Sequence, residues 1–299
     1  MNDSYRRVSG GALLLTALYC AALGSWGIRS AVAEEVQVLY AGSLVNFMEY
    51  GIGPAFERAR GERFRGHAAG SSALASQIKG RLRRGDVFIS AVPEVNEVLM
   101  GEHNGDWVSW YVSFAESPLV IGYGAASRFA SDFQTRPWHQ VLLQPGVRIG
   151  RTDPRLDPKG ALTLTLMQRA AEFYRVPDLA MRVLGAPDNP AQVVPEETLV
   201  GRLQSGELDA GFFYSTETAT ARIPTIRLPP QVATKAEYTV SILRNAPDPQ
   251  AAEHFVTFLL GPQGRSEMQE HGLALRELEL TGSATQAPAS VRAFLHDSP

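Results

Sequence analysis

Residues 36–47 read VQVLYAGSLVNF, and this stretch decides the fold class. Its first five residues form an apolar, β-branched run, which predicts a strand, and Ala41-Gly42-Ser43 then forms a small polar turn. After the turn, apolar residues recur at helical spacing, namely Leu44, Phe47, Met48 and Phe56. The stretch therefore predicts a strand, a tight turn and a helix in that order.

The same order recurs along the chain. A short extended stretch begins at Phe64, Gly70-Ser71-Ser72 forms a second turn, and a helical pattern follows it. Further strands are predicted at 86–91, 118–123, 147–150, 210–214 and 237–243, and further helices at 161–174, 195–204, 249–260 and 262–271. Strands that alternate with helices predict an α/β fold with mainly parallel sheets flanked by helices. The tail 276–299 has the weak patterning that is typical of mobile chain ends.

The length of 299 residues exceeds what one hydrophobic core usually spans, which favours two lobes. The apolar strand near 118 leaves the first lobe and the strand near 238 returns to it. We therefore expect residues 34–118 plus 238–299 in lobe one and residues 119–237 in lobe two, with the two crossing strands as a hinge.

Residues 1–33 have the pattern of an export signal. Arg6 and Arg7 precede an apolar stretch, and Ala31-Val32-Ala33 matches a small-x-small cleavage site, so we expect a periplasmic protein. The alternative is a lipid anchor on Cys20, which the bulky Tyr19 before it disfavours. Without this segment, which holds three arginines and one aspartate, the formal net charge changes from −3 to −5. Such a charge disfavours nucleic acid as a partner.

Motifs of common catalytic and cofactor sites are missing from the sequence. The six histidines are scattered, and the single cysteine lies within the export signal, which disfavours a metal centre. The chain has no G-x-S-x-G elbow, no P-loop and no G-x-G-x-x-G after a strand. We therefore expect no cofactor.

Ser43 and Ser71 each open a helix directly after a strand. A helix start carries free backbone N–H groups and the positive end of the helix dipole, and a serine adds an O–H donor, which suits an anion such as sulfate or phosphate. Serine is also a favoured N-cap in any protein, so each serine alone is more simply explained as a cap.

Seven stretches together resemble the periplasmic molybdate- and tungstate-binding proteins of ABC transporters. They are LYAGSLVNFM (39–48), GSSALASQI (70–78), DVFISA (86–91), SPLVIGY (117–123), GRTDPRLDPKG (150–160), ELDAGFFYSTE (207–217) and FVTFLLGPQG (255–264). The resemblance implies a type II periplasmic-binding-protein fold with two hinged lobes. It also implies a monomer that captures a tetrahedral oxyanion, delivers it to an ABC permease, and catalyses no reaction.

The resemblance also implies which residues bind the anion. They are Ser43, Ser71, the segment around Lys159, the segment around Thr198, and Tyr214, with Ser72 as a substitute for Ser71. Of Lys159 we expect the backbone N–H to take part and not the ammonium. Carboxylates complete the site in some relatives, and the candidates here are Asp157 and Glu197, with Asp153 and Glu217 nearby. We expect a tetrahedral site made of donors, with carboxylate ligation as the alternative.

The sequence is also compatible with other functions. A donor-only site favours molybdate, tungstate or sulfate over phosphate, because phosphate retains a proton that needs an acceptor. A ferric ion would call for clustered tyrosines or carboxylates. A periplasmic serine hydrolase would use Ser43 or Ser71 with His67, the one histidine nearby in the sequence. A regulatory or chemoreceptor partner would share the fold.

Overall fold

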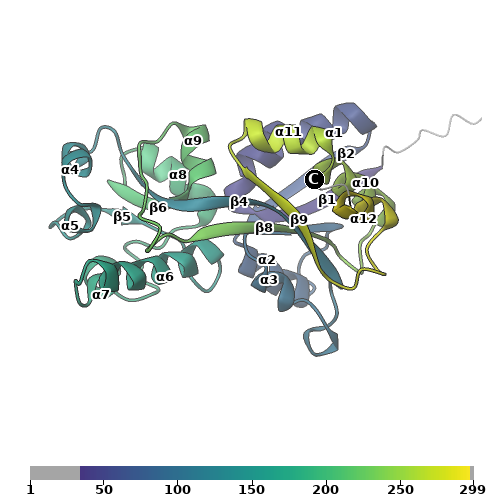
Figure 1. Ribbon diagram of the computed structural model, residues 1–299, viewed down its shortest axis with the longest axis horizontal. Coiled ribbons are helices and arrows are strands. Elements are labelled where there is room, and N and C mark those ends of the chain that lie inside the picture. Colours follow the sequence, from purple (N-terminus) through teal and green to yellow (C-terminus); the bar gives the residue numbers. More distant parts are fainter. Residues whose placement is uncertain (1–33, 297–299) are drawn as a thin grey trace, which may run out of the picture. The chain divides into compact units, whose positions relative to one another are not determined.

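The computed structural model describes residues 34–296 (Figure 1). The predicted export signal, with its cleavage site and Cys20, lies outside the described residues. Within them, no helix is long and apolar enough to cross a membrane.

Nine strands form one mixed sheet in the described part of the chain. They are β1 (Glu35–Ala41), β2 (Arg63–Ala69), β3 (Val87–Ser90), β4 (Trp110–Tyr123), β5 (Ile149–Gly150), β6 (Ala210–Tyr214), β7 (Thr225–Ile226), β8 (Lys235–Ile242) and β9 (Ala274–Gly282). The main path runs β2-β1-β3-β8-β4-β6-β5, and β7 and β9 pair with β4.

The parallel pairing predicted from the alternating pattern holds for part of the sheet. Strands β2, β1 and β3 pair in parallel, as do β5 and β6, whereas β8 pairs antiparallel with β3 and β4, and β4 also pairs antiparallel with β6, β7 and β9. Parallel neighbours need a crossover helix, and the helices predicted after residues 36–40 and 64–69 supply it. The antiparallel pairs join strands far apart in the sequence, which the alternating pattern does not predict.

The helices cover both sides of this sheet (Figure 1). They are η1 (Gly42–Leu44), η2 (Phe47–Ile52), α1 (Gly53–Arg60), α2 (Ser71–Lys79), α3 (Glu94–Glu97), η3 (Glu102–Asn104), α4 (Ala130–Thr135), α5 (Trp138–Leu142), α6 (Pro158–Phe173), α7 (Leu179–Leu184), α8 (Glu196–Gln204), α9 (Ser215–Ala221), α10 (Pro249–Leu260), α11 (Pro262–Glu270) and α12 (Ala289–His296). The helix predicted after Ser43 is divided into a 3₁₀ turn, a π-helical segment and the α-helix α1.

The tail is more ordered than its sequence pattern suggested. Strand β9 pairs antiparallel with the first half of β4, and α12 packs near it with Val291 fully buried. The weak pattern of β9 has a physical cause, because most of its residues stay partly exposed and only Leu278 is buried. Pairing with β4 holds this segment in place, and Leu275, Leu278 and Leu280 pack on the core.

Strands β4 and β8 pair with each other and run between two groups of elements in Figure 1. The first half of β4 also pairs with β9, and its second half pairs with β6 and β7. The predicted lobe boundaries near 118 and 238 fall within these two strands. The division into residues 34–118 plus 238–299 and residues 119–237 stays a prediction.

Candidate functional site

The two serines predicted to bind an anion are both buried and both lie where a helix begins. Ser43 lies in η1, and its Oγ is 3.1 Å from the hydroxyl of Tyr238 on β8. Ser71 is the first residue of α2, and its Oγ accepts a hydrogen bond from the Ala91 N–H at 3.1 Å. Because Ser71 accepts this bond, its own O–H stays available to donate to a ligand.

Two glycines let the serine turns approach the opposite part of the site. A Cβ on Gly42 would come within 2.6 Å of Glu196 Oε2, and a Cβ on Gly70 would come within 2.3 Å of the Leu156 carbonyl oxygen. The Leu156 carbonyl also accepts a hydrogen bond from the Ala73 N–H at 3.0 Å. The η1 turn therefore lies against the start of α8, and the start of α2 lies against the turn before α6.

Lys159 is fully buried, and its ammonium contacts two carboxylates. Its Nζ lies 2.8 and 3.0 Å from the two oxygens of Glu217 and 3.3 Å from Glu196 Oε1. Its backbone N–H donates to Asp157 Oδ1, which caps α6. The expectation that Lys159 binds the anion through its amide stays a prediction; in this structure the amide bonds to Asp157 and the ammonium bonds to Glu217 and Glu196.

Three buried carboxyl groups surround this single ammonium: Asp157, Glu196 and Glu217. Burial raises the pKa of Glu196 to about 8, and the charge of Asp157 acts in the same direction. Burial also raises the pKa of Asp157 and of Glu217, against the opposing effect of Lys159. For the ammonium, burial acts to lower the pKa, but the three carboxylates outweigh it and the pKa lies above its ordinary value. A site made only of donors, as the sequence predicted, does not describe this cluster.

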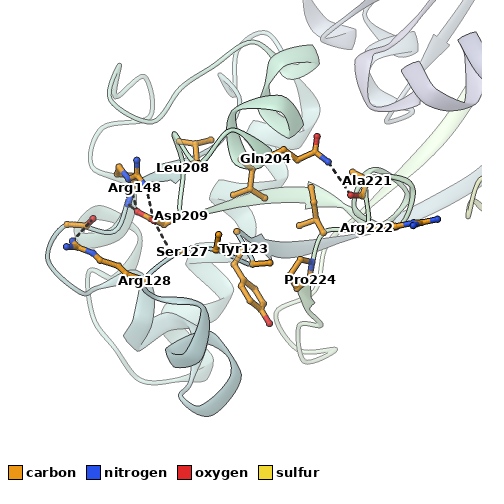
Figure 2. Close-up of a pocket in the computed structure, with 17 residues that line it drawn as sticks. Tyr123, Ser127, Arg128, Arg148, Gln204, Leu208, Asp209, Ala221, Arg222 and Pro224 are labelled. Carbon is orange, nitrogen blue, oxygen red and sulfur yellow. Dashed lines mark hydrogen bonds and ion pairs between the residues drawn. The ribbon is translucent and has the colours of Figure 1, made fainter.

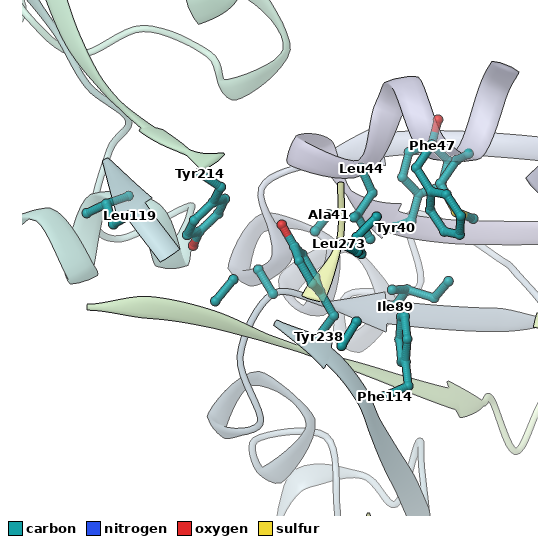
Figure 3. Close-up of a cluster of buried hydrophobic side chains, with 14 of the residues drawn as sticks. Tyr40, Ala41, Leu44, Phe47, Ile89, Phe114, Leu119, Tyr214, Tyr238 and Leu273 are labelled. Carbon is teal, nitrogen blue, oxygen red and sulfur yellow. The ribbon is translucent and has the colours of Figure 1, made fainter. Parts of the chain in front are cut away.

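Tyr214 ends β6 with a fully buried side chain (Figure 3). Its ring lies edge-on to Tyr238 with 6.2 Å between centroids, and Lys159 Nζ lies 5.4 Å from the Tyr214 ring. Burial raises the pKa of both tyrosines, so their hydroxyls are neutral donors. The Tyr214 N–H donates to Glu217 Oε2 at 2.7 Å, which fixes the tyrosine beside the carboxylate cluster.

Buried polar atoms without a hydrogen-bond partner concentrate at this cluster. Within the described residues there are seven such side-chain atoms, and four of them are Asp157 Oδ2, both oxygens of Glu196, and the Tyr214 hydroxyl. Of these, Glu196 Oε1 still has its ion-pair contact with Lys159. A buried polar atom left unpaired costs about 1–3 kcal/mol, so proteins rarely gather them without a ligand. A cavity of about 290 Å³ opens beside them and is lined by Gly70, Asp157 and Glu196, among others.

Three of the predicted residues have side chains that are not buried in this cluster, although Glu197 lines the 290 Å³ cavity beside it. The Thr198 hydroxyl donates to the Pro195 carbonyl of its own helix start, and its N–H lies 3.1 Å from the same oxygen. Glu197 is exposed, and the buried acid is its neighbour Glu196. Ser72 is half-buried, and its carbonyl accepts from Ser76. Glu196 is therefore a further candidate carboxylate, and Glu197 stays a prediction.

The sequence contained a pattern that could have identified Glu196. Glu196, Leu199 and Leu203 stand at i, i+3 and i+7 on α8, and all three are buried. An acid on the apolar face of a helix is unusual unless it is paired or functional. Glu217 stands near the relevant turn in the sequence, and its place is local, because it lies in the first turn of α9 and accepts from the Tyr214 N–H. Tyr238 had no such signal, because its place follows from the pairing of β8 with β3 and β4.

Arg151 is a positioning residue for Glu196. It is fully buried, and its guanidinium donates to the carbonyls of Ala186 and Pro187 and to Gln192 Oε1. These bonds hold the loop that leads into α8. The buried arginine therefore fixes the place where α8 begins, and with it Glu196.

A larger cavity lies elsewhere in the described part of the chain (Figure 2). It measures about 720 Å³ and is lined by Tyr123, Arg148 and Asp209, among others. Arg148 and Asp209 form an ion pair there, 2.9 Å between Nε and Oδ2. None of the residues predicted to bind the anion lines this cavity.

The hydrolase alternative lacks its catalytic geometry. Ser43 contacts Tyr238 and Ser71 contacts Ala91, and within residues 34–296 no histidine hydrogen-bonds to either serine. Burial is the largest effect on His67, and it lowers the pKa of this histidine on β2.

The fold and the buried polar cluster define a solute-binding protein of the type II periplasmic-binding-protein class. The chain belongs to the bacterial extracellular solute-binding protein family, whose family profile matches residues 36–274. It is a transport protein that binds a solute, and not an enzyme.

Individual relatives agree with this family. The chain is 31% identical to a solute-binding protein of Petrotoga mobilis, over 85% of this chain and 88% of the relative. It is 25% identical to the molybdate/tungstate-binding protein WtpA of Thermococcus kodakarensis, over 87% of this chain and 90% of the relative. Among solved structures, the periplasmic molybdate-binding protein of Azotobacter vinelandii has the same fold with a TM-score of 0.62. It has 17% identity, covering 81% of this chain and 99% of that one.

Proposed function

We propose that this protein captures molybdate or tungstate outside the cytoplasm and delivers it to an ABC permease. The observation that carries the proposal is the group of buried, unpartnered polar atoms on Asp157, Glu196 and Tyr214. The hydroxyls of Ser43 and Ser71 and the Lys159 ammonium would add donors for the oxo groups. The name of the Thermococcus kodakarensis relative supports the choice of ligand.

The carboxylates bear on which oxyanion fits. A dianion beside Asp157 and Glu196 is repelled unless these groups hold protons or bond to the central atom. Molybdenum and tungsten can accept further oxygen ligands beyond their four oxo groups, whereas the sulfur of sulfate and the phosphorus of phosphate cannot. We therefore propose that Asp157 and Glu196 ligate the metal of the bound oxyanion. The Lys159 ammonium would balance the charge that Glu217 contributes.

The buried carboxylates also change the expectation for phosphate. A site without acceptors would reject the phosphate proton, but the oxygens of Asp157 and Glu196 could accept it. Preference for molybdate and tungstate therefore depends on ligation of the central atom by the two carboxylates. The affinities for sulfate and phosphate, which cannot be ligated in this way, test this ligation directly.

Calorimetric titration with four anions tests the function. We expect molybdate and tungstate to bind with one anion per chain, and sulfate and phosphate to bind about a hundredfold more weakly or not at all, a difference of about 2.7 kcal/mol. Because a ligand that binds only the folded state stabilises it, the thermal midpoint should rise in the same order. Equal affinity for sulfate would contradict the coordination step, and binding of none of the four would contradict the proposed function.

A further inference from the structure

Glu34, Glu62 and His254 bring three metal-ligating groups together away from the anion site. Each offers one ligand atom, and these atoms all lie within 4.8 Å of one another. Glu34 directly precedes β1, Glu62 lies between α1 and β2, and His254 lies on α10. The backbone of Glu34 is held in place, because its carbonyl accepts a hydrogen bond from the Arg63 N–H at 2.8 Å.

Glu62 has a carboxylate oxygen that nothing in the described residues satisfies. The residue is 8% exposed, and its Oε1 lies 2.8 Å from His254 Nδ1 and 3.3 Å from Arg60 Nε. Its Oε2 is buried and has no hydrogen-bond partner among residues 34–296. This is the one carboxylate outside the anion site with such an oxygen in the described part of the chain, and an unpaired buried oxygen is unfavourable unless a ligand binds it.

A cavity lies beside His254, one of the three residues of this cluster. It measures about 660 Å³ and is lined by Arg60, Glu253, His254 and Ser290, among others. Glu253 is already engaged, because its Oε1 accepts from the Ser290 hydroxyl. The cavity leaves room for water, which usually completes the coordination of a metal held by three protein ligands.

We propose that Glu34, Glu62 and His254 bind a divalent transition-metal ion, with Zn²⁺ as the best fit. Two carboxylate oxygens and one imidazole nitrogen are a donor set that zinc accepts, whereas Ca²⁺ and Mg²⁺ prefer oxygen alone. Zinc bonds of roughly 2.0–2.2 Å place tetrahedral ligand atoms about 3.4 Å apart. Glu62 Oε1 and His254 Nδ1, now 2.8 Å apart, would therefore open slightly, and Glu34 would adjust from within its 4.8 Å limit. Glu34 is exposed and lies at the start of a strand, so it can make this movement.

Arg60 provides the sharpest distinction between a metal site and a simple ion pair. Its guanidinium is 40% exposed and contacts Glu62, so a bound cation would displace it into solvent. If the cluster is only an ion-pair network, Arg60 is one of its members and stabilises Glu62. If the cluster binds metal, Arg60 competes with the metal.

Titration of Zn²⁺ into the untagged protein, freed of metal with EDTA, tests the proposal by calorimetry. We expect one Zn²⁺ per chain, with Ca²⁺ and Mg²⁺ giving no binding. His254→Ala and Glu62→Gln should each weaken Zn²⁺ binding about tenfold or more, because each removes one of three protein ligands. Arg60→Gln should tighten it, because a competing positive charge is removed.

A second glutamate–histidine pair serves as the matched control. Glu267 Oε2 lies 3.9 Å from His271 Nδ1, so Glu267→Gln removes a similar pair and should leave Zn²⁺ affinity unchanged. Far-UV circular dichroism checks that each variant is folded. The proposal fails if the wild type does not bind Zn²⁺ or if His254→Ala binds it equally well. Weaker Zn²⁺ binding by Arg60→Gln than by the wild type would also contradict the proposal. If His254→Ala does not fold, the Zn²⁺ affinity of Arg60→Gln is the deciding measurement.

Discussion

Replacing Lys159 by methionine is expected to lower the free energy of unfolding by about 3–5 kcal/mol and to weaken oxyanion binding more than a hundredfold. Lys159 is fully buried and is the cation that faces Glu217 and Glu196. Its removal leaves these carboxyl groups buried without a counter-charge, and it also removes a donor to the anion. Chemical denaturation and calorimetric titration measure the two effects separately.

Two further variants show whether the effect comes from burial. Lys235 forms an ion pair with Glu116 at the surface and is 53% exposed, so Lys235→Met should cost only about 0–1 kcal/mol. Combining Lys159→Met with Glu217→Gln should recover part of the lost stability, because the second change removes one unpaired charge. If Lys159→Met and Lys235→Met cost the same, the buried cluster does not carry the charges assigned to it.

Glu196→Gln is expected to act in opposite directions on binding and on stability. Molybdate affinity should fall about a hundredfold, about 2.7 kcal/mol, because a ligand to the metal is lost. The ligand-free protein should become more stable at high pH, because the amide cannot ionise in a buried place. Glu197→Gln is the comparison variant: Glu197 is exposed and lines the same cavity, so its change should leave stability unaltered and lower molybdate affinity less than Glu196→Gln does. Unchanged molybdate affinity in Glu196→Gln would mean that this carboxyl group does not face the anion.

The raised pKa of Glu196 determines the pH range over which this carboxyl group lowers the stability of the ligand-free protein. Its pKa is about 8 in the folded protein, against an ordinary glutamate value of 4.5, so the folded state holds the proton more tightly between these values. Stability of the ligand-free wild type should therefore fall as the pH rises from about 4.5 to about 8, at a rate of up to roughly 1.4 kcal/mol per pH unit from this group. Asp157 and Glu217 contribute with the same sign. Denaturation of the wild type and of Glu196→Gln at several pH values should show a flatter profile for the variant.

Much of the fold could be predicted because local patterns decide it. The strand at 36–40, the turn at Ser43 and the helix that opens at Ser71 all correspond to observed elements. Buried strands such as β3 and β6 have continuous apolar sequences because both of their faces are covered. The early part of β4 was missed although its sequence is apolar and buried, and β9 was missed because its apolar residues are few and only partly buried.

The charges and contacts of the candidate site could not be predicted from the sequence, because they depend on which distant residues meet in the folded protein. Asp157 accepts a hydrogen bond from the Lys159 N–H. The lysine side chain is buried and contacts Glu196 and Glu217, which lie 37 and 58 positions further along the chain. Which of Glu196 and Glu197 is buried depends on where α8 begins, and Arg151 fixes that point through the loop before it. The serines were predictable because a strand, a small turn and a helix form a local pattern, although neither serine caps its helix, whereas a buried charge cluster has no such pattern.

The position of tungsten in crystals of the tungstate complex is the most direct test of the central claim. Anomalous scattering at a tungsten absorption edge identifies this element without assumptions about the protein. We expect one strong peak enclosed by Ser43, Ser71, Asp157, Glu196 and Tyr214, with oxygens of Asp157 and Glu196 within bonding distance of the metal. A peak in the large cavity beside Arg148, or no peak at the carboxylate cluster in crystals grown with saturating tungstate, would contradict the account.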